Sequence, residues 1–455
     1  MQHVNLGREE PRDAKVNVSI NSLLNSEGAG GKNIEMVNGE ESYVQRVADL
    51  PVKFDLLTKV KNYTKYVGVT QNFKEVIDYF NVSESKTPAG FRIEFNLDTD
   101  GVLRADLVRD ISYDTNGRKR PTKVLFSVDT ANPYEVAPIK DLVANLTCNP
   151  GIIYDLFINN PEANVDGRFK TRDEVMKELG RILGPGADIS VELNDPFRKS
   201  EQEIMEEVEK FKEMLSPYRL VVKVPHTGPV NGDNVEQLLK GDKRFNKSYD
   251  DGSTEDLLRG HNLALMLAEN DIRVNFTLMF DPHQTALALQ ARPYFINSFV
   301  RQRLFQSETM QRLLDFYKDT EDTSYLEELK ERMLEKDYFP PQNNDMDLMD
   351  VKNLAEKILT YRNIDNSEGQ DGLDAVRHNL RMLKHANLPD TRLIICSMQG
   401  DMFMDIDKLL TEDEFQDMGH RILITAVPNY LARFTSSNLV INYQRRFMNA
   451  AQGEK

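Results

Sequence analysis

Eight short apolar segments, many of them rich in β-branched residues, recur in the second part of the chain, and longer amphipathic segments separate most of them. Such runs are typical of parallel strands that are buried on both faces and joined by helices. Eight strand–helix units are the number that closes a (β/α)8 barrel, so we predict an α/β fold of this TIM-barrel type. The eight segments are VLFSVD (124–129), ANLTCN (144–149), DISVEL (188–193), RLVVKV (219–224), IRVNFTLMF (272–280), YFINSFV (294–300), RLIICS (392–397) and RILITA (421–426).

The sequence before the first of these segments has a different character. Residues 1–45 are rich in Asn, Gly, Ser and Glu, which favours a flexible N-terminal arm. The GAGGK segment at 28–32 could cradle a phosphate, but its spacing is not that of a P-loop. Residues 46–120 are expected to form a small α/β module, because they contain one amphipathic helical segment (71–80) and two alternating segments around Asp100-Gly101.

The barrel itself is assigned to residues 121–440, with insertions at 228–253 and 303–390, and residues 441–455 are assigned to a C-terminal tail. A calcium loop at residues 96–107 is rejected in favour of a plain hairpin, because Leu107 stands where a bidentate Glu is required.

Composition excludes several classes of function. A net charge of −16 disfavours nucleic-acid and anionic-membrane binding, since both need a basic surface. There is no bilayer-spanning apolar tract and no apolar signal-peptide core, so a cytoplasmic location is expected. The two cysteines, Cys148 and Cys396, are too few for a disulfide framework or a zinc site and are expected to be buried free thiols. We predict neither a metal nor an organic cofactor.

Polar residues interrupt the apolar pattern near the C-terminal ends of most of the predicted strands. An unpaired polar group inside a barrel would cost about 1–3 kcal/mol, so a ring of them needs a reason. The C-terminal ends of barrel strands are where active sites form, and we predict one there. The residues are Asp129, Asn149, Glu192, Lys223, Asn275 with Thr277, Asn297 with Ser298, and Ser397.

Lys223 is the most informative of them. It lies among Val221, Val222 and Val224, and burial among apolar side chains disfavours the ammonium form. A neutral amine is what nucleophilic attack on a carbonyl carbon requires. The alternative is a purely structural ion pair with an acidic residue from another strand.

Taken together, these motifs resemble the transaldolase and fructose-6-phosphate aldolase family. The segments that carry the resemblance are VDTANP (128–133), LTCNPGII (146–153), SVEL (190–193), VVKVPHT (221–227), VNFTLMF (274–280), FINSFV (295–300) and ICSMQ (395–399). Their order and spacing match the family over about 300 residues, from 122 to 430, whereas the residues before 120 match nothing familiar.

The resemblance implies roles for four catalytic residues. Lys223 falls on the lysine that forms a Schiff base with a ketone substrate, and Asp129 on the carboxylate that moves protons at the substrate hydroxyls. Glu192 and Thr277 fall on the pair that holds the catalytic water. This assignment is chemically reasonable, because an iminium ion is an electron sink and acid–base groups move protons around it.

The resemblance also implies a substrate-binding set. Asn149 and Asn275 fall on residues that hydrogen-bond the substrate hydroxyls, and further contacts are expected from Asn297, Phe299, Arg301, Ser397 and Gln399. Glu192 and Phe299 are typical of the transaldolase branch, since the aldolase branch has Gln and Tyr there. The leading hypothesis is therefore a transferase that moves a three-carbon, dihydroxyacetone-type unit. Such reactions belong to pentose phosphate and related carbohydrate metabolism.

The sequence departs from the family where the family grips phosphate. The family uses arginines at two positions where this chain has Gln302 and Gln399, and neutral Gln cannot give a charge-assisted bidentate contact. Either the substrate lacks the usual phosphate or other cations replace the arginines. The candidates for such cations, Lys240, Lys243, Arg244 and Lys247, lie in the insertion at 228–253, which could equally be a solvated loop. His226 and His283 also replace small or apolar family residues.

Two further hypotheses stay open. A Schiff-base aldolase would use the same intermediate to cleave or form a ketose without transfer. A non-catalytic barrel would serve as a binding or assembly module. The expected partner is a small sugar or sugar phosphate, and assembly into a homo-oligomer is possible.

Overall fold

The computed structural model describes residues 17–49, 51–80, 90–114, 119–215, 218–248, 251–278, 281–396, 402–431 and 438–453. The chain divides into two compact units. One comprises residues 1–123 with 183–189 and 210–220, and the other comprises residues 124–182, 190–209 and 221–455.

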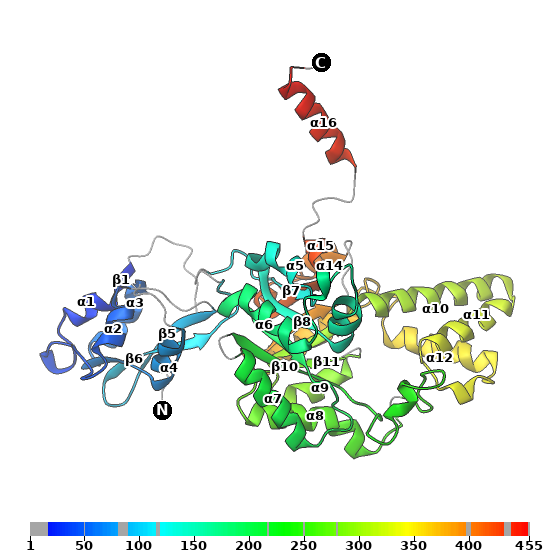
Figure 1. The fold of residues 1–455 in the computed structure, drawn as a ribbon, viewed down its shortest axis with the longest axis horizontal. Coiled ribbons are helices and arrows are strands. Elements are labelled where there is room, and N and C mark those ends of the chain that lie inside the picture. Colours follow the sequence, from blue (N-terminus) through cyan, green and yellow to red (C-terminus); the bar gives the residue numbers. More distant parts are fainter. Residues whose placement is uncertain are drawn as a thin grey trace. The chain divides into compact units, whose positions relative to one another are not determined.

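A closed, eight-stranded parallel barrel is the central feature of the fold, as the sequence predicts (Figure 1). Each of the eight apolar segments contributes one strand, and the order around the barrel is β10-β11-β12-β13-β14-β7-β8-β9. The strands are β7 (Leu125–Asp129), β8 (Val143–Cys148), β9 (Asp188–Glu192), β10 (Arg219–Pro225), β11 (Val274–Thr277), β12 (Phe295–Phe299), β13 (Arg392–Cys396) and β14 (Ile422–Ala426).

Helices follow most strands, as a (β/α)8 topology requires. The principal ones are α6 (Arg172–Leu183), α7 (Glu201–Leu215), α8 (Thr254–Glu269), α9 (His283–Gln290), α13 (Asp374–His385) and α14 (Met402–Leu409). Gly260 lets α8 approach the end of β10 closely, because a Cβ atom there would lie 2.4 Å from the carbonyl oxygen of Pro225. The short helix α15 (Pro428–Leu431) follows β14.

A buried ion pair joins the first residues of β9 and β10. Arg219 Nε lies 2.9 Å from Asp188 Oδ1, and both side chains are completely inaccessible to solvent. Arg219 also donates through Nη1 to the carbonyl oxygen of Gly90 at 2.8 Å. Gly90 has φ +71°, and a Cβ atom there would lie 2.1 Å from Arg219 Nη1, so glycine is required.

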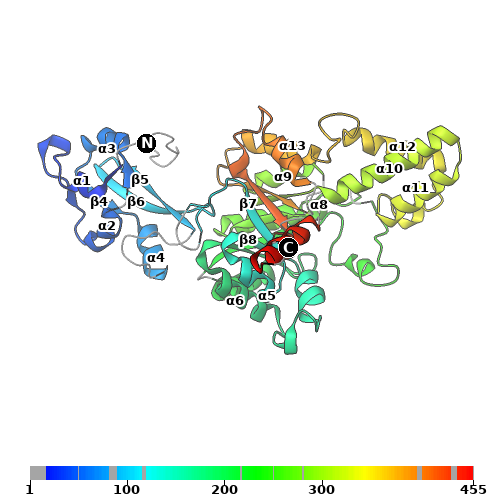
Figure 2. The same ribbon diagram turned by 90° about the horizontal axis from the view of Figure 1, so that it is seen from above.

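The insertion predicted at 303–390 begins as a helical layer with its own apolar core. Helices α10 (Arg301–Thr320), α11 (Ser324–Glu335) and α12 (Leu348–Tyr361) lie side by side in both views (Figures 1 and 2). The predicted loop insertion at 228–253 contacts this layer, because Arg244 pairs with Asp337 at 2.7 Å and Gln342 donates to the Asn246 carbonyl oxygen.

The N-terminal α/β module begins earlier in the chain than expected. Its four-stranded sheet has the order β2-β4-β6-β5, and a two-stranded sheet pairs β1 with β3. Its elements are β1 (Asn17–Ser19), α1 (Ile20–Leu24), β2 (Glu35–Met36), α2 (Glu41–Ala48), β3 (Pro51–Lys53), α3 (Phe54–Lys61), β4 (Tyr66–Val69), α4 (Gln71–Phe80), β5 (Phe91–Leu97) and β6 (Val102–Arg109). The hairpin of β5 and β6 closes with Leu97 opposite Leu103, as predicted.

Residues 17–45 therefore differ from the flexible arm that their composition suggests. Ile20, Leu23, Ile34 and Val44 are all buried in the core of the module. A few well-spaced apolar residues are enough to fix this polar segment, because burial stabilises each by about 1.5–3 kcal/mol. Residues 1–16 of the predicted arm lie outside the described residues.

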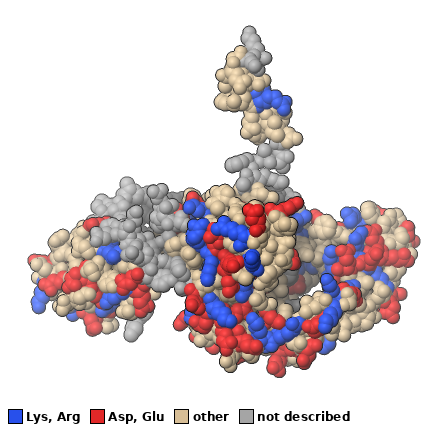
Figure 3. Space-filling model, viewed as in Figure 1, with Lys and Arg blue, Asp and Glu red and all other residues tan. Residues whose placement is uncertain are grey.

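The predicted C-terminal tail is also different, since it contains helix α16 (Leu439–Ala451). No residue of α16 is buried, and the only charged side chains of this helix are Arg445 and Arg446. On the face shown in Figure 3, acidic and basic side chains are otherwise interspersed. No helix in the described parts of the chain is both long and apolar enough to cross a membrane.

Candidate active site

Lys223 lies inside the barrel near the C-terminal end of β10. Its neighbours Val222 and Val224 are fully buried, and the lysine is only 6% exposed. Nζ lies 3.0 Å from Glu192 Oε2 on the adjacent strand β9 and donates to the carbonyl oxygen of Cys148 at 3.3 Å. Two acceptors, one on β9 and one on β8, thus hold the amine in place.

The charge of this amine differs from the expectation drawn from its valine neighbours. Burial alone lowers the pKa of Lys223, but the carboxylates of Glu192 and Asp129 outweigh burial and raise the pKa above its ordinary value. The two carboxylates therefore favour the ammonium form of the amine, whereas attack on a carbonyl needs the deprotonated form. Burial disfavours the ammonium form, as the valine neighbours suggest, but the carboxylates from other strands act in the opposite direction and outweigh it.

Asp129 is the last residue of β7 and faces the same space. Burial raises the pKa of its carboxyl group, Lys223 lowers it, and the charge of Glu192 raises it further. A carboxyl group with a raised pKa exchanges protons more readily near neutral pH than an ordinary aspartate does. Lys223, Glu192 and Asp129 thus bring one amine and two carboxyl groups together at the same cavity.

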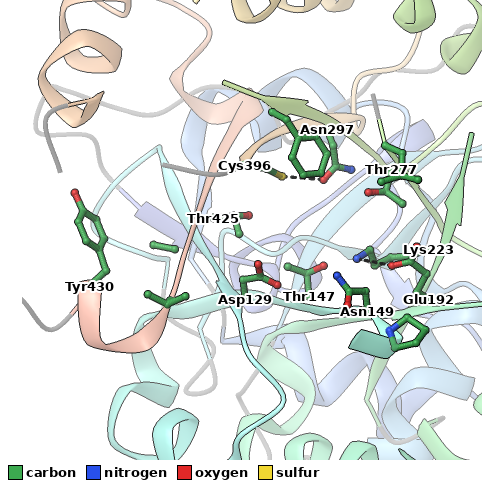
Figure 4. Close-up of a pocket in the computed structure, with 15 residues that line it drawn as sticks. Asp129, Thr147, Asn149, Glu192, Lys223, Thr277, Asn297, Cys396, Thr425 and Tyr430 are labelled. Atoms are coloured by element: carbon green, nitrogen blue, oxygen red, sulfur yellow. Dashed lines mark hydrogen bonds and ion pairs between the residues drawn. The ribbon is translucent and has the colours of Figure 1, made fainter. Parts of the chain in front are cut away.

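These side chains line a cavity of about 460 Å³ at the C-terminal ends of the strands. Figure 4 shows the labelled residues around a common space; most lie on different barrel strands, Asn149 follows β8, and Tyr430 lies on α15. The residues that line it are Asp129, Thr147, Asn149, Pro150, Glu192, Lys223, Thr277, Leu278, Asn297, Phe299, Cys396, Thr425, Ala426, Val427 and Tyr430. The volume suits a small sugar-like molecule.

A chain of hydrogen bonds runs across the barrel interior and reaches the cavity at Asn297 and Cys396. Each member donates to the next, from Cys396 to Asn297 (3.1 Å), Asn275 (2.6 Å), Ser190 (3.2 Å), Asn145 (2.9 Å) and Ser127 (2.7 Å). Asn297 Nδ2 also donates to the Phe276 carbonyl oxygen at 2.8 Å. Both N–H bonds of Asn297 are therefore already used by the protein.

Only some of the predicted substrate-binding residues line the cavity. Asn149, Asn297 and Phe299 line the cavity. Asn275 does not line it, because it is completely buried in the hydrogen-bonded chain. Arg301 is exposed at the start of α10 and does not line the cavity either.

Two predicted contacts, Ser397 and Gln399, lie outside the described residues. The neighbouring cation Arg303 is unsuited to a ligand, since its guanidinium pairs with Asp374 and Asp281, each at 2.7 Å.

The remaining candidate residues lie away from the cavity. His226 packs against Phe276, with ring centroids 4.4 Å apart, and burial lowers its pKa to about 4. His283 lies at the start of α9 and does not line the cavity. Of the cations in the loop insertion, Lys240 pairs with Glu236 at 2.7 Å. None of the four predicted loop cations is among the residues that line the cavity.

Several residues that line the cavity were missed in the sequence. Thr147, Cys396, Thr425 and Tyr430 were not assigned to the site. The sequence could have indicated Thr425, because this polar residue lies near the C-terminal end of the eighth predicted strand, as the predicted site residues do on the other strands. Both cysteines are buried free thiols, as expected. Among the described residues no group of His, Cys, Asp or Glu could hold a metal ion.

Comparison with known proteins supports this interpretation of the site. The family described as transaldolase/fructose-6-phosphate aldolase matches residues 126–332. The match spans β7 to β12, and so contains Asp129, Glu192, Lys223 and Thr277, and it supports an aldolase-type enzyme that works through a Schiff base. No curated protein matches the chain. Residues 126–332, a little under half of the chain, are therefore similar to the transaldolase/fructose-6-phosphate aldolase family.

Proposed function

We propose that the protein is a transaldolase-like transferase that moves a three-carbon, dihydroxyacetone-type unit from an unphosphorylated ketose to an aldehyde. The observation that carries the proposal is the buried Lys223 amine, 3.0 Å from Glu192 and inside a cavity of sugar size. The family supports the Schiff-base chemistry, whereas transfer and the nature of the substrate are the parts that we add.

In the proposed mechanism, Glu192 first takes a proton from the Lys223 ammonium group. The free amine attacks the ketone carbon, and the carbinolamine loses water to become an iminium ion. Asp129 then removes the proton from the hydroxyl group of the carbon beyond the bond to be broken. That bond breaks, its electron pair moves into the iminium as an enamine, and an aldehyde leaves.

The second half of the reaction repeats these steps in reverse with another aldehyde. The enamine carbon attacks the new carbonyl group, and its oxygen takes a proton from Asp129. Water, positioned by Glu192 and Thr277, then hydrolyses the iminium and releases the new ketose. Thr277 suits this role, since it lines the cavity and is only 3% exposed.

The charge of the cavity supports an unphosphorylated substrate. Among the described residues that line it, Lys223 is the only cation, and it pairs with Glu192. Asn297 also lines the cavity, but both N–H bonds of its side-chain amide are used within the protein. Phosphate recognition favours charge-assisted contacts, and the described part of the cavity offers none beyond the lysine.

Transfer is preferred over simple cleavage because Glu192 and Phe299 both resemble the transaldolase branch. Both residues line the cavity, where they can influence the lifetime of the enamine before an acceptor aldehyde binds. The aldolase alternative uses the same lysine, so the experiment must separate the two by their products.

The test is borohydride reduction of the protein with dihydroxyacetone, fructose or fructose 6-phosphate, followed by mass spectrometry. We expect a three-carbon adduct with dihydroxyacetone and fructose, a weaker reaction with fructose 6-phosphate, and no adduct in Lys223→Met. Incubation with fructose, with and without D-glyceraldehyde-3-d as a labelled acceptor, separates the activities. Label appearing in a ketose without release of free dihydroxyacetone supports transfer, whereas free dihydroxyacetone formed at the same rate without acceptor would identify an aldolase.

A further inference from the structure

Thr425 presents an unused hydroxyl group to the active-site cavity. The residue lines the cavity and is 5% exposed, and its Oγ1 atom has no hydrogen-bond partner among the described residues. Buried hydroxyl groups are nearly always paired, so an unpaired one at a cavity wall points to a ligand. In Figure 4 Thr425 lies between Cys396 and Asp129, with its hydroxyl toward the open space.

The place of Thr425 in the barrel is opposite that of Lys223. The lysine is on β10 and the threonine is on β14, and four steps along the eight-stranded order lead from one strand to the other in either direction. Thr425 pairs in register with Ser127 of β7, two residues before Asp129. A substrate that is bonded to Lys223 and passes Asp129 therefore reaches Thr425 with its far end.

The surroundings of Thr425 leave its hydroxyl group available. Its polar neighbour is the Cys396 thiol, whose hydrogen goes to Asn297 Oδ1 at 3.1 Å. Burial raises the pKa of this thiol to about 12, and a weak side-chain hydrogen bond from the Thr425 hydroxyl to the sulfur, too poor in geometry to satisfy that hydroxyl, offsets the effect only in part. The sulfur is therefore neutral and a weak acceptor. Next to it, Ala426 and Val427 supply apolar surface for the carbon chain of a ligand.

We propose that Thr425 is a specificity-determining residue whose hydroxyl binds a hydroxyl group on the aldehyde half of the substrate. The inference rests on the proposed function, because it needs a substrate anchored at Lys223. A neutral hydroxyl beside aliphatic carbon suits a hydroxylated carbon chain, and it gives no charge to hold a phosphate. The residue thus selects acceptors by their hydroxyl pattern.

The test compares three deuterium-labelled aldehyde acceptors with fructose as the donor: D-glyceraldehyde, lactaldehyde and 3-hydroxypropanal. The last two each lack one hydroxyl group of the first. We expect the wild type to prefer D-glyceraldehyde, and Thr425→Val to lose about two- to tenfold of kcat/KM for it, the range for one neutral hydrogen bond. Its kcat/KM for the matching deoxy aldehyde stays unchanged, and Thr425→Ser restores the preference.

Ser298→Ala is the matched control. Ser298 Oγ is also buried and unpaired among the described residues, but the residue does not line the cavity. This variant should keep the wild-type preference.

The outcomes separate this inference from the proposed function. A Thr425→Val protein that still forms the borohydride adduct at Lys223 and keeps the wild-type preference would overturn the inference alone. An equal loss for all three aldehydes would also overturn it, since that would indicate a structural role. Absence of the adduct in the wild type would overturn the proposed function first.

Discussion

The buried pair of Arg219 and Asp188 joins the two strands that carry Glu192 and Lys223. Asp188 is the first residue of β9 and Arg219 the first of β10, and Glu192 and Lys223 each lie four residues further along the same strand. Replacing Arg219 by methionine keeps most of the side-chain volume but leaves the Asp188 carboxylate in a place with no solvent access. The substitution therefore removes the positive charge of Arg219 while it keeps most of the packing around the side chain.

The magnitude follows from burial. Removing one partner of a fully buried pair costs about 3–5 kcal/mol, because the remaining charge is desolvated without compensation. The lost hydrogen bond to the Gly90 carbonyl oxygen, now 2.8 Å long, adds about 1 kcal/mol. Urea denaturation followed by circular dichroism should show a fall of this size in the free energy of unfolding of Arg219→Met. Arg219→Met with Asp188→Leu should recover a large part of the loss, because no charge stays buried.

The matched control is Arg181→Met. Arg181 pairs with Glu178 at 2.8 Å, but its side chain is 68% exposed. Such surface pairs contribute about 0–1 kcal/mol, so the control should change stability little. If Arg219→Met costs less than about 1 kcal/mol, close to the control, the reasoning from burial is refuted.

Three further predictions concern the site and its support. Glu192→Gln removes the nearest of the charges that raise the pKa of Lys223, so the pH midpoint of borohydride trapping should fall, while turnover drops about 10²–10⁴-fold; an unchanged midpoint would contradict this. Asp129→Asn should reduce turnover by a similar factor. Burial raises the pKa of the Asp129 carboxyl group, so its ionised form destabilises the native state above the native pKa, and the effect disappears below the ordinary value of 3.8. Asp129→Asn should therefore be more stable than the wild type in thermal melts at neutral pH, and the advantage should shrink on acidification; a constant difference would argue against it. Gly260→Ala should lower stability by several kcal/mol, because its Cβ atom would meet the Pro225 carbonyl oxygen at 2.4 Å; an unchanged melting temperature would refute the close approach.

The barrel could be predicted because its signal is local. Each strand is a short apolar run, and β-branched residues such as Val221 and Val222 favour strands wherever they are buried. The cavity could be predicted for a similar reason, because Lys223 and Asp129 are polar residues at the ends of apolar runs. Buried polar side chains need polar partners, and in a barrel these come from the neighbouring strands.

Other features depend on contacts between distant segments. Asn275 and Thr277 both face the barrel interior from β11, but only Thr277 lines the cavity, because Ser190 and Asn297 enclose Asn275. The charge of Lys223 could not be derived from its neighbours in sequence, since carboxylates of β7 and β9 set it. The ordered segment from residue 17 onward depends on a core that its polar composition conceals.

The most direct measurement is peptide mapping of the protein after borohydride reduction in the presence of dihydroxyacetone. A three-carbon modification confined to the peptide that contains Lys223 is the predicted result. A modification spread over surface lysines, or no modification at all under conditions in which the protein is folded, would contradict the central claim that this buried amine forms the imine.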